Sequence, residues 1–229
     1  METAGSEGVT ILCRPDDEYP ASLPELSHPP LCVYLLGALP ADLDFRSVAI
    51  VGMRTPSDFG VHMVREFAVP AARVGWSTVS GLASGIDTVV HRSAVEAGGM
   101  TVAVLGSGLA NVYPPEKNVL VRALVHAGGA VVSEYPMNRE SARYTLPRRN
   151  RIIAGLSRCT LVVEAAERSG ALLSAAHAAN RGCPVFAVPG AEDNPLSAGC
   201  NNLIRQGVMP ALRFADVFES ICPTCCQTC

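Results

Sequence analysis

The 229-residue sequence predicts an α/β fold, doubly wound, in which a mostly parallel sheet carries helices on both faces. Two observations support this prediction. From about residue 47 onward, short apolar runs alternate with helical stretches, and glycines stand at the turns between them. The short runs are apolar at nearly every position, as expected for strands that are covered on both faces of a parallel sheet. This is the pattern of an extended Rossmann-like domain.

The elements can be placed in order along the chain. The expected strands are 47–52, 77–81, 101–106, 130–134, 160–165 and 184–190. The expected helical stretches between them are 57–75, 84–99, 116–129 and 169–182, and a further helix should begin near Pro147. These stretches end in glycine, which suits the C-terminal cap of a helix. Pro70 lies inside the first stretch and is expected to kink or divide that helix.

Three segments are expected. Residues 1–46 form an N-terminal lead-in packed on the core, residues 47–221 form the Rossmann-like domain, and residues 222–229 form a cysteine-rich tail. With 48% hydrophobic and 17% charged residues, the chain has the composition of a folded protein. It has no apolar run of about 18 residues, which would be long enough for a membrane span, and its first residues lack the basic start of a secretory signal. We therefore expect a cytoplasmic protein.

The nine cysteines fall into two groups. Five are scattered singly, several of them in apolar segments, and are expected to be reduced and buried: Cys13, Cys32, Cys159, Cys183 and Cys200. Four crowd the tail in two overlapping CxxC spacings, which could hold zinc: Cys222, Cys225, Cys226 and Cys229. Because no histidine or second pair of ligands supports the tail, we favour the interpretation without a metal.

Ligands of a parallel sheet bind at the carboxyl ends of its strands, where helices begin. The first strand is followed by Gly52 and Arg54, with Thr55 expected to cap the next helix, so the helix start and the arginine predict an anion site. The second strand runs into SGLASGID (80–87), in which glycines leave room for an extended ligand. The common alternative for each segment is an ordinary turn between a strand and a helix.

A block of arginine stands out in a chain of net charge −3. Between residues 139 and 158 there are six arginines and one acidic residue, Glu140. The expected helix would bury Ile152 and its apolar neighbours and turn its arginines elsewhere. A solvated charged face is the simpler interpretation. A row of phosphate contacts is favoured because it would join this block to the two anion sites at the same edge of the sheet.

The sequence does not predict an enzyme. The segment GSGLAN (106–111) lacks the third glycine of a dinucleotide fingerprint, so we expect no NAD and no other cofactor. The P-loop, zinc-protease and serine-hydrolase motifs are absent from the sequence. His91 follows the second candidate turn without a partner nucleophile, so a structural role is favoured over that of a catalytic base.

Several of these segments resemble the DNA-processing protein A family, also called DprA or Smf, over roughly residues 19–208. The resemblance is carried by VGMRTPSDFG, SGLASGID, AVLGSGLANVYPPEKN, SEYP, LPRRNRIIAGLS, VVEAAERSGALLSAAHA and VFAVPG…SAGCNNLI, in that order. It implies a non-catalytic homodimer that binds single-stranded DNA, protects incoming strands in natural transformation and loads the RecA recombinase. The family's winged-helix domain and N-terminal helical domain are not recognised in this sequence.

The residues and the resemblance together give a set of expected DNA contacts. They are Gly52, Arg54, Ser57, Ser80, Gly81, Ser84, Gly85, Arg143, Arg148, Arg149, Asn150, Arg151, Ser169 and Gly170. The sequence departs from the family's pattern at three places. Leu146 stands where the family has phenylalanine, Met53 where a small residue is usual, and Pro70 within a helix that is normally continuous.

Two other functions are alternatives to DNA binding. A related Rossmann-like fold serves phosphoribohydrolases that process nucleotides, but these need a PGGxGT loop where this chain has PGAED at 189–193. A nucleotide-sensing module could use the same anion sites for a mononucleotide. Both predict saturable binding of a nucleotide, whereas a DNA-binding protein should prefer an oligonucleotide and should be strongly salt-dependent.

Overall fold

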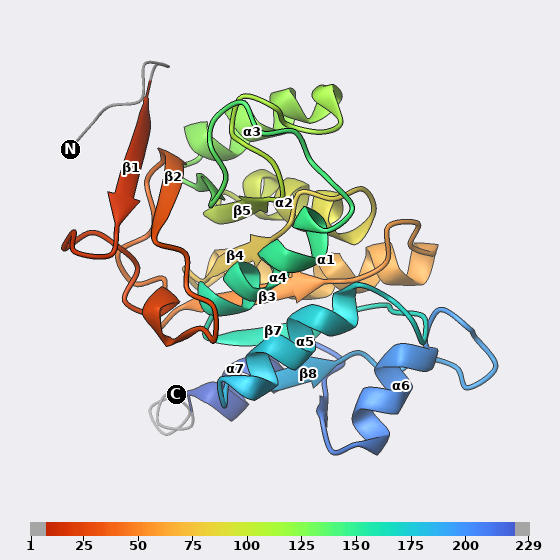
Figure 1. Cartoon of the computed structure of the whole chain (residues 1–229). Coiled ribbons are helices and arrows are strands. Elements are labelled where there is room, and N and C mark those ends of the chain that lie inside the picture. The colour runs from red at the N-terminus through yellow and green to blue at the C-terminus, as the bar shows by residue number, and fades with distance from the viewer. Residues whose placement is uncertain (1–7, 223–229) are drawn as a thin grey trace.

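Nine strands form one sheet in the computed structural model of the protein, which describes residues 8–222 (Figure 1). The strands are β1 (Val9–Cys13), β2 (Cys32–Gly37), β3 (Ser47–Val51), β4 (Ser77–Ser80), β5 (Thr101–Leu105), β6 (Ala130–Ser133), β7 (Cys159–Val162), β8 (Val185–Ala187) and β9 (Met209–Pro210). The helices are η1 (Leu23–Glu25), α1 (Asp58–Arg73), α2 (Ile86–Glu96), η2 (Pro115–Lys117), α3 (Asn118–His126), α4 (Thr145–Gly155), α5 (Ala171–Asn180), α6 (Ala198–Arg205) and α7 (Phe214–Ile221).

The predicted parallel sheet is confirmed. The strands lie in the order β1-β2-β6-β5-β4-β3-β7-β8-β9, and every neighbouring pair from β6 to β9 is parallel. The sequence did not predict β1, β2 and the two-residue β9. The first two strands pair antiparallel with each other, and β2 also pairs antiparallel with β6, so residues 8–46 extend the sheet at one edge. The domain boundaries at residues 46 and 221 stay predictions.

The order of the strands creates a crevice next to the central strand β3. The chain first moves outward through β4, β5 and β6, then crosses back to β7 on the other side of β3. The helix that follows β3, α1, and the helix that follows β7, α5, cover opposite faces of the sheet. The loops that lead into these two helices therefore separate at the carboxyl edge of the sheet. This switch point is where open α/β sheets bind ligands.

The predicted helices on both faces are also confirmed. Alternate residues of β3 face opposite ways: Ile50 packs in one core with α1 and α7, and Ala49 packs in the other core with α4 and α5. A third cluster continues the first face beneath α3. All five residues of β3 are buried, which is why its apolar residues, 48–51, follow one another without alternation.

Three helix starts or interruptions differ from those expected. Ser57, rather than Thr55, caps α1, because its hydroxyl accepts a hydrogen bond from the Gly60 amide (3.2 Å). Pro70 does not divide α1, which continues to Arg73; the proline falls in the last turn, where few residues of the helix remain to be disturbed. α4 begins two residues before Pro147, which therefore occupies the first turn, a position that proline tolerates.

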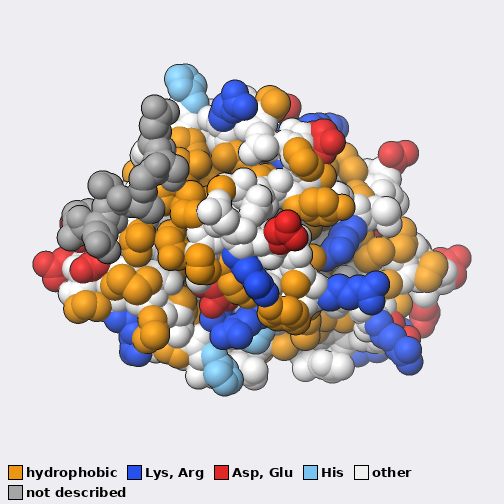
Figure 2. Space-filling model, turned by 45° about the horizontal axis from the view of Figure 1, so that its top comes forward, with side chains coloured by type: hydrophobic (Ala, Val, Ile, Leu, Met, Phe, Trp, Pro, Cys, Tyr) orange, Lys and Arg blue, Asp and Glu red, His pale blue; other side chains and the backbone are white. Residues whose placement is uncertain are grey.

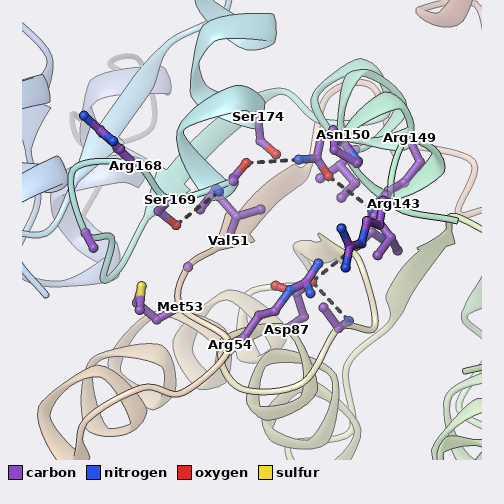
Figure 3. A pocket seen from close by; sticks show the side chains of 18 residues that line it. Val51, Met53, Arg54, Asp87, Arg143, Arg149, Asn150, Arg168, Ser169 and Ser174 are labelled. Atoms are coloured by element: carbon purple, nitrogen blue, oxygen red, sulfur yellow. Dashed lines mark hydrogen bonds and ion pairs between the residues drawn. The ribbon is translucent and has the colours of Figure 1, made fainter. Parts of the chain in front are cut away.

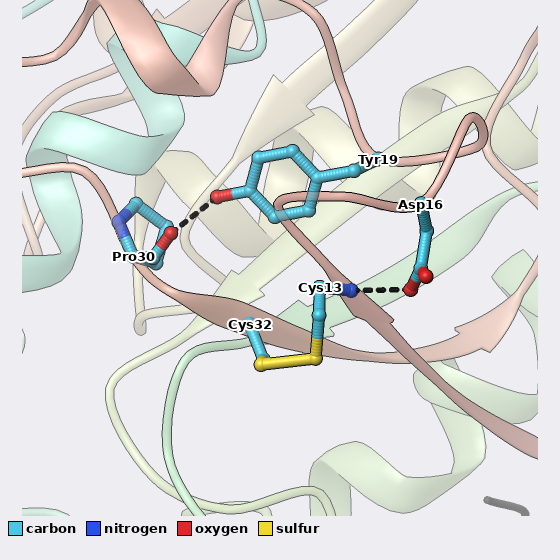
Figure 4. The surroundings of a disulfide bond; sticks show 5 residues. All are labelled: Cys13, Asp16, Tyr19, Pro30 and Cys32. Carbon is cyan, nitrogen blue, oxygen red and sulfur yellow. Dashed lines mark hydrogen bonds between the residues drawn. A yellow bond between two sulfur atoms is a disulfide. The ribbon is translucent and has the colours of Figure 1, made fainter. Parts of the chain in front are cut away.

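Two of the singly placed cysteines are not reduced as expected. Cys13 and Cys32 form a disulfide, because the antiparallel pairing of β1 and β2 places them directly opposite each other (Figure 4). The segment between them is folded back on itself, with the Tyr19 hydroxyl donating to the Pro30 carbonyl (2.5 Å). Cys159 and Cys200 are buried free thiols, as predicted, and Cys183 is half-buried.

The predicted tail is only partly described. Cys222 is a half-buried free thiol, and Cys225, Cys226 and Cys229 lie outside the described residues. Within residues 8–222, no group of histidine, cysteine and acidic side chains is arranged to hold a metal ion. No helix in the same range has the length and apolar character needed to cross a membrane.

Candidate functional site

A pocket of about 480 Å³ opens at the switch point of the sheet, beyond the carboxyl ends of β3 and β7 (Figure 3). We call it the switch-point pocket. The loop after β3 contributes Gly52 to Arg54, and the segment after β7 contributes Ala166 and the residues from Arg168 to Ala171. The first part of α4 and the segment before it form a third wall, and the turn after β4 reaches the pocket through Ala83 and Asp87. Segments far apart in the sequence therefore meet here.

Three exposed arginines line this pocket, and each comes from a different segment. Arg54 follows β3, Arg143 precedes α4, and Arg168 follows β7. Within the described residues, none of them has a carboxylate within 4 Å. Arg54 and Arg143 lie on the same side of the pocket in Figure 3, and Arg168 extends at its other end. The pocket thus carries three unneutralised positive charges, which favours a polyanion as ligand.

A fourth arginine lies beneath the pocket and acts within the protein. Arg149 is 4% exposed and donates hydrogen bonds to the carbonyl oxygens of Gly81 and Val104. Its Nη2 lies 3.7 Å from Oδ2 of Asp87, and its Nε donates to Oδ1 of Asn150 (3.1 Å). Burial lowers the pKa of the guanidinium, and the Asp87 carboxylate opposes that effect. Arg149 therefore joins the ends of β4 and β5 to α4.

The turn between β4 and α2 is held from its other side by Lys117, the chain's single lysine. Its ammonium donates to the carbonyl of Leu82, a residue in the left-handed region with a φ of 55°. Burial lowers the pKa of Lys117 to about 8. The Asp87 carboxylate accepts from the Ala83 amide in the same turn (3.2 Å). Two buried cations and one carboxylate thus fix the backbone that separates the switch-point pocket from a neighbouring cavity of about 500 Å³.

The predicted anion site at the start of α1 is filled by the protein's own Glu164. This side chain is 1% exposed and accepts from the amide (2.9 Å) and the hydroxyl (2.6 Å) of Ser57. A Cβ at Gly60 would collide with the same carboxylate. A carboxylate at a helix N-terminus is stabilised by the helix dipole. Ser57 is consequently bonded inside the protein and does not line the pocket.

The far wall of the pocket is a joint between α4 and α5. Nδ2 of Asn150 donates to the Gly170 carbonyl (3.1 Å), and the Ser169 hydroxyl accepts from the Ala171 amide (3.3 Å). Beneath them, the hydroxyl of Ser174 is buried, lines the pocket and has no hydrogen-bond partner among the described residues. Asn150 therefore sets the distance between the arginine block and the loop after β7.

The structure divides the predicted arginine block between two sides of α4. Arg143 and Arg149 belong to the pocket side. Arg148 is exposed on the opposite side, where Arg151 is buried and pairs with Glu134 (2.5 Å). The expectation that Arg149 and Arg151 face away from the interior is wrong. Both are buried because carbonyl or carboxylate partners compensate for the loss of water.

Half of the expected contact residues line the switch-point pocket: Gly52, Arg54, Arg143, Arg149, Asn150, Ser169 and Gly170. The others lie outside it: Ser57, Ser80, Gly81, Ser84, Gly85, Arg148 and Arg151. Ser80 is fully buried, with its hydroxyl on the Ile50 carbonyl (2.7 Å), and Ser84 and Gly85 line the neighbouring cavity. That any of these residues contacts DNA stays a prediction.

Sequence reasoning missed Arg168 and the apolar part of the pocket. Arg168 stands in AERSG just after the strand next to the switch point, which is a signal that could have identified it. Met53, Leu146 and Pro147 also line the pocket and give it an apolar wall beside the guanidinium groups. Such a wall can contact the faces of nucleobases.

The segments considered for catalysis have structural roles. His91 is fully buried with Nδ1 2.7 Å from Oγ1 of Thr101, and burial lowers its pKa to about 3, so the imidazole is neutral. It does not line the pocket. In GSGLAN, the Gly108 amide donates to the Arg139 carbonyl (2.7 Å), and a Cβ there would collide with the backbone of residues 136–137. That loop is covered by protein.

Comparison with solved structures identifies the fold more closely. DNA processing protein A (DprA) from Streptococcus pneumoniae superposes with a TM-score of 0.83 at 36% identity, over 93% of this chain and 74% of that one. DNA processing protein A from Helicobacter pylori, studied for its single-stranded DNA binding mode, gives a TM-score of 0.82 at 23% identity, over 94% and 96% of the two chains. The latter likeness concerns the fold alone.

The sequence comparisons agree with this result. The Smf protein of Synechocystis sp. is 42% identical over 96% of this chain, which spans 56% of that relative's length. The DprA protein of Streptococcus pneumoniae is 40% identical, over 88% of this chain and 71% of its own. The sequence model of the family described as DNA recombination-mediator protein A matches residues 10–222. The chain therefore belongs to the DNA recombination-mediator protein A family.

Proposed function

We propose that the switch-point pocket binds single-stranded DNA. The observation that carries the proposal is the convergence of three exposed and unpaired arginines, Arg54, Arg143 and Arg168, on one pocket from three separate segments. Guanidinium groups bind phosphate oxygens through paired hydrogen bonds, and Asp87, the described carboxylate that lines the pocket, is paired with Arg149 rather than with these three arginines. The apolar wall of Met53, Leu146 and Pro147 gives an unpaired base a surface to contact.

The size of the pocket favours a single strand over a duplex. A volume of about 480 Å³ admits one or two unpaired nucleotides, whereas a double helix presents its bases only inside the stack. The pocket offers charged side chains to a ligand rather than a fixed row of backbone amide groups. Such a lining suits a backbone of repeating phosphates, read without reference to sequence.

Two observations disfavour the alternative of a nucleotide-processing enzyme or a nucleotide sensor. Glu164 occupies the N-terminus of α1, where a Rossmann-like nucleotide site would place a phosphate, and its negative charge repels one. In the PGAED segment, the amide and the carbonyl of Gly190 are both bonded to the side chain of Asn201 (3.2 and 3.1 Å). The backbone of Gly190 is therefore not available to a phosphate.

The wider role follows from the family and is part of the proposal. The family is one of recombination mediators, and the Helicobacter pylori relative binds single-stranded DNA. We infer that this protein acts without catalysis, as a cytoplasmic homodimer that protects incoming strands and loads a RecA-type recombinase in natural transformation. Because the chain spans about half the length of the Synechocystis relative, partners and whole-protein activity are proposals for this chain. Light scattering and co-elution with a purified recombinase would test the dimer and the partner.

The central test is the binding of fluorescein-labelled oligo-dT, measured by anisotropy at two salt concentrations. Arg54→Gln, Arg143→Gln and Arg168→Gln should each weaken binding and reduce the salt slope by about 0.7 per lost phosphate contact. Arg158→Gln is the matched control, because Arg158 is an exposed arginine just before β7, at the opposite edge of the sheet. If the triple variant bound oligo-dT as tightly as the unaltered protein, the proposal would be rejected.

A further inference from the structure

A second group of basic and aromatic side chains lies on the side of α4 that faces away from the switch-point pocket. We call it the α4 outer patch and define it as Arg139, Tyr144 and Arg148. Tyr144 and Arg148 are four residues apart and therefore lie on one side of the helix. The pocket side is formed by other positions of the same helix, including Leu146, Asn150 and Ile153.

The patch carries positive charge that the described residues do not neutralise. Arg139 and Arg148 are exposed, and neither has a carboxylate within 4 Å. Arg151, on the same side of α4, differs because it is buried against Glu134 at 2.5 Å. Two exposed cations are therefore available to an external anion. Figure 2 shows one face of the molecule, on which basic side chains are interleaved with hydrophobic ones and an acidic side chain lies near the middle.

The patch also presents an aromatic ring. Tyr144 is 58% exposed, and its hydroxyl accepts a hydrogen bond from Arg139. An exposed ring that is anchored at its hydroxyl keeps a fixed orientation and open surface. Aromatic rings among cations are the usual means of holding single-stranded nucleic acid, because bases stack on the ring while phosphates contact the charges.

The patch and the pocket are continuous. Arg143 lines the pocket and is the residue immediately before Tyr144, so the two surfaces meet at the start of α4. A helix with its side chains is only about 10–12 Å across, so a few nucleotides suffice to cross it.

We propose that a single strand bound in the switch-point pocket continues across the start of α4 onto the α4 outer patch. There its phosphates contact Arg139 and Arg148, and one base stacks on Tyr144. The proposal rests on the proposed function, since it extends the path of the same strand. A strand that left the pocket by the opposite exit would pass Ser84 toward Arg92, which lines the neighbouring cavity. That cavity's other cation, Lys117, is buried and already donates to Leu82, so this exit offers a single exposed cation.

Oligonucleotide length separates the two surfaces in an experiment. A short oligo-dT of about two nucleotides should occupy the pocket alone, and one of about twenty should also cover the patch. Tyr144→Ala should weaken binding of the long strand roughly tenfold and leave the short strand unchanged. The double variant Arg139→Gln/Arg148→Gln should reduce the salt slope for the long strand by about 1.4. The matched control is Arg92→Gln, which should leave both strands unaffected.

A chimeric strand tests the stacking itself. If about two thymidines are followed by abasic sugar-phosphates, the extension offers phosphates but no bases. Tyr144→Ala should then have no effect, whereas the double arginine variant should still weaken binding. The proposal is overturned if the patch variants leave the long strand unchanged, if they weaken short and long strands equally, or if only Arg92→Gln selectively weakens the long strand. Failure of the proposed function is a different result, in which loss of Arg54 and Arg143 does not weaken even the short strand.

Discussion

Arg149 provides the sharpest test of how the site is built, because sequence reasoning and the structure assign it different roles. The sequence places it in a row of phosphate contacts. The structure buries it under the pocket, where it bonds Gly81 and Val104 and pairs with Asp87. We predict that Arg149→Met greatly destabilises the fold, since it leaves a buried carboxylate and two carbonyl groups without their partner.

The magnitude follows from the contacts. Removing one partner of a buried ion pair costs about 3–5 kcal/mol. For a domain of this size, each kcal/mol lowers the melting temperature by about 2–4 °C, so a fall of about 6–20 °C is expected. The neighbouring Arg148→Met, at an exposed position, should change the free energy of unfolding by no more than about 0.5 kcal/mol.

Urea unfolding can be followed through Trp76, the chain's single tryptophan, which is buried against Phe214 and Phe218. Asp87→Asn should recover part of the stability that Arg149→Met loses, because it removes the unpaired charge and keeps an oxygen for the Ala83 amide. The reasoning would be refuted by an Arg149→Met protein that unfolds at the same urea concentration as the unaltered protein but no longer binds oligo-dT. Arg149 would then be a contact residue and not an internal support.

Four further predictions concern groups away from the binding surface. The pKa of His91 is lowered to about 3, so between pH 6.5 and 3 the unfolded chain binds a proton at this residue that the folded protein does not bind. The free energy of unfolding should therefore fall with falling pH, by up to about 1.4 kcal/mol per pH unit from this group. His91→Gln should flatten that slope in acid denaturation, and an unchanged slope would contradict the prediction. After reductive methylation with a ¹³C label, the single lysine should titrate near pH 8 in NMR spectra, and titration near 10.5 would show that Lys117 is solvated. Replacing Cys13 and Cys32 by serine should lower the free energy of unfolding by about 3 kcal/mol, and reductant should have the same effect on the unaltered protein; equal urea midpoints with and without reductant would contradict the disulfide. Glu164→Ala should cost about 1–3 kcal/mol because the Ser57 amide and hydroxyl lose their acceptor, and a neutral result would show that water replaces it.

The sequence predicts the parallel part of the sheet and the edge at which the switch-point pocket opens. The runs at 48–51 and 102–105 are apolar at every position, which is typical of strands covered on both faces, and their alternation with helices predicts a parallel sheet. Ligand-binding loops then have to lie at the carboxyl ends, which is where Arg54 and Arg143 meet. The strands β1 and β2 escaped prediction because only some of their residues are buried and because they lie in a segment rich in proline.

The orientation of individual charged side chains could not be predicted in the same way. Arg149 and Arg151 have the same local context as the exposed Arg148, and what buries them is a set of acceptors on β4, β5 and the segment after β6. Glu164 lies inside the segment 160–165 that is expected to be a strand, and nothing near it in the sequence indicates that it reaches α1, more than a hundred residues earlier. These contacts depend on tertiary proximity, which a local pattern does not contain.

The carboxylate of Glu164 has a consequence for the energetics of association. Many phosphate-binding loops become ordered only when the ligand arrives, and the entropy lost in ordering them is subtracted from the affinity. Here the first loop of the site is held in place by an internal anion, so residues 52–57 have the same support with or without DNA. The free protein should therefore present a preformed receptor, and little of the binding energy should be spent on conformational ordering.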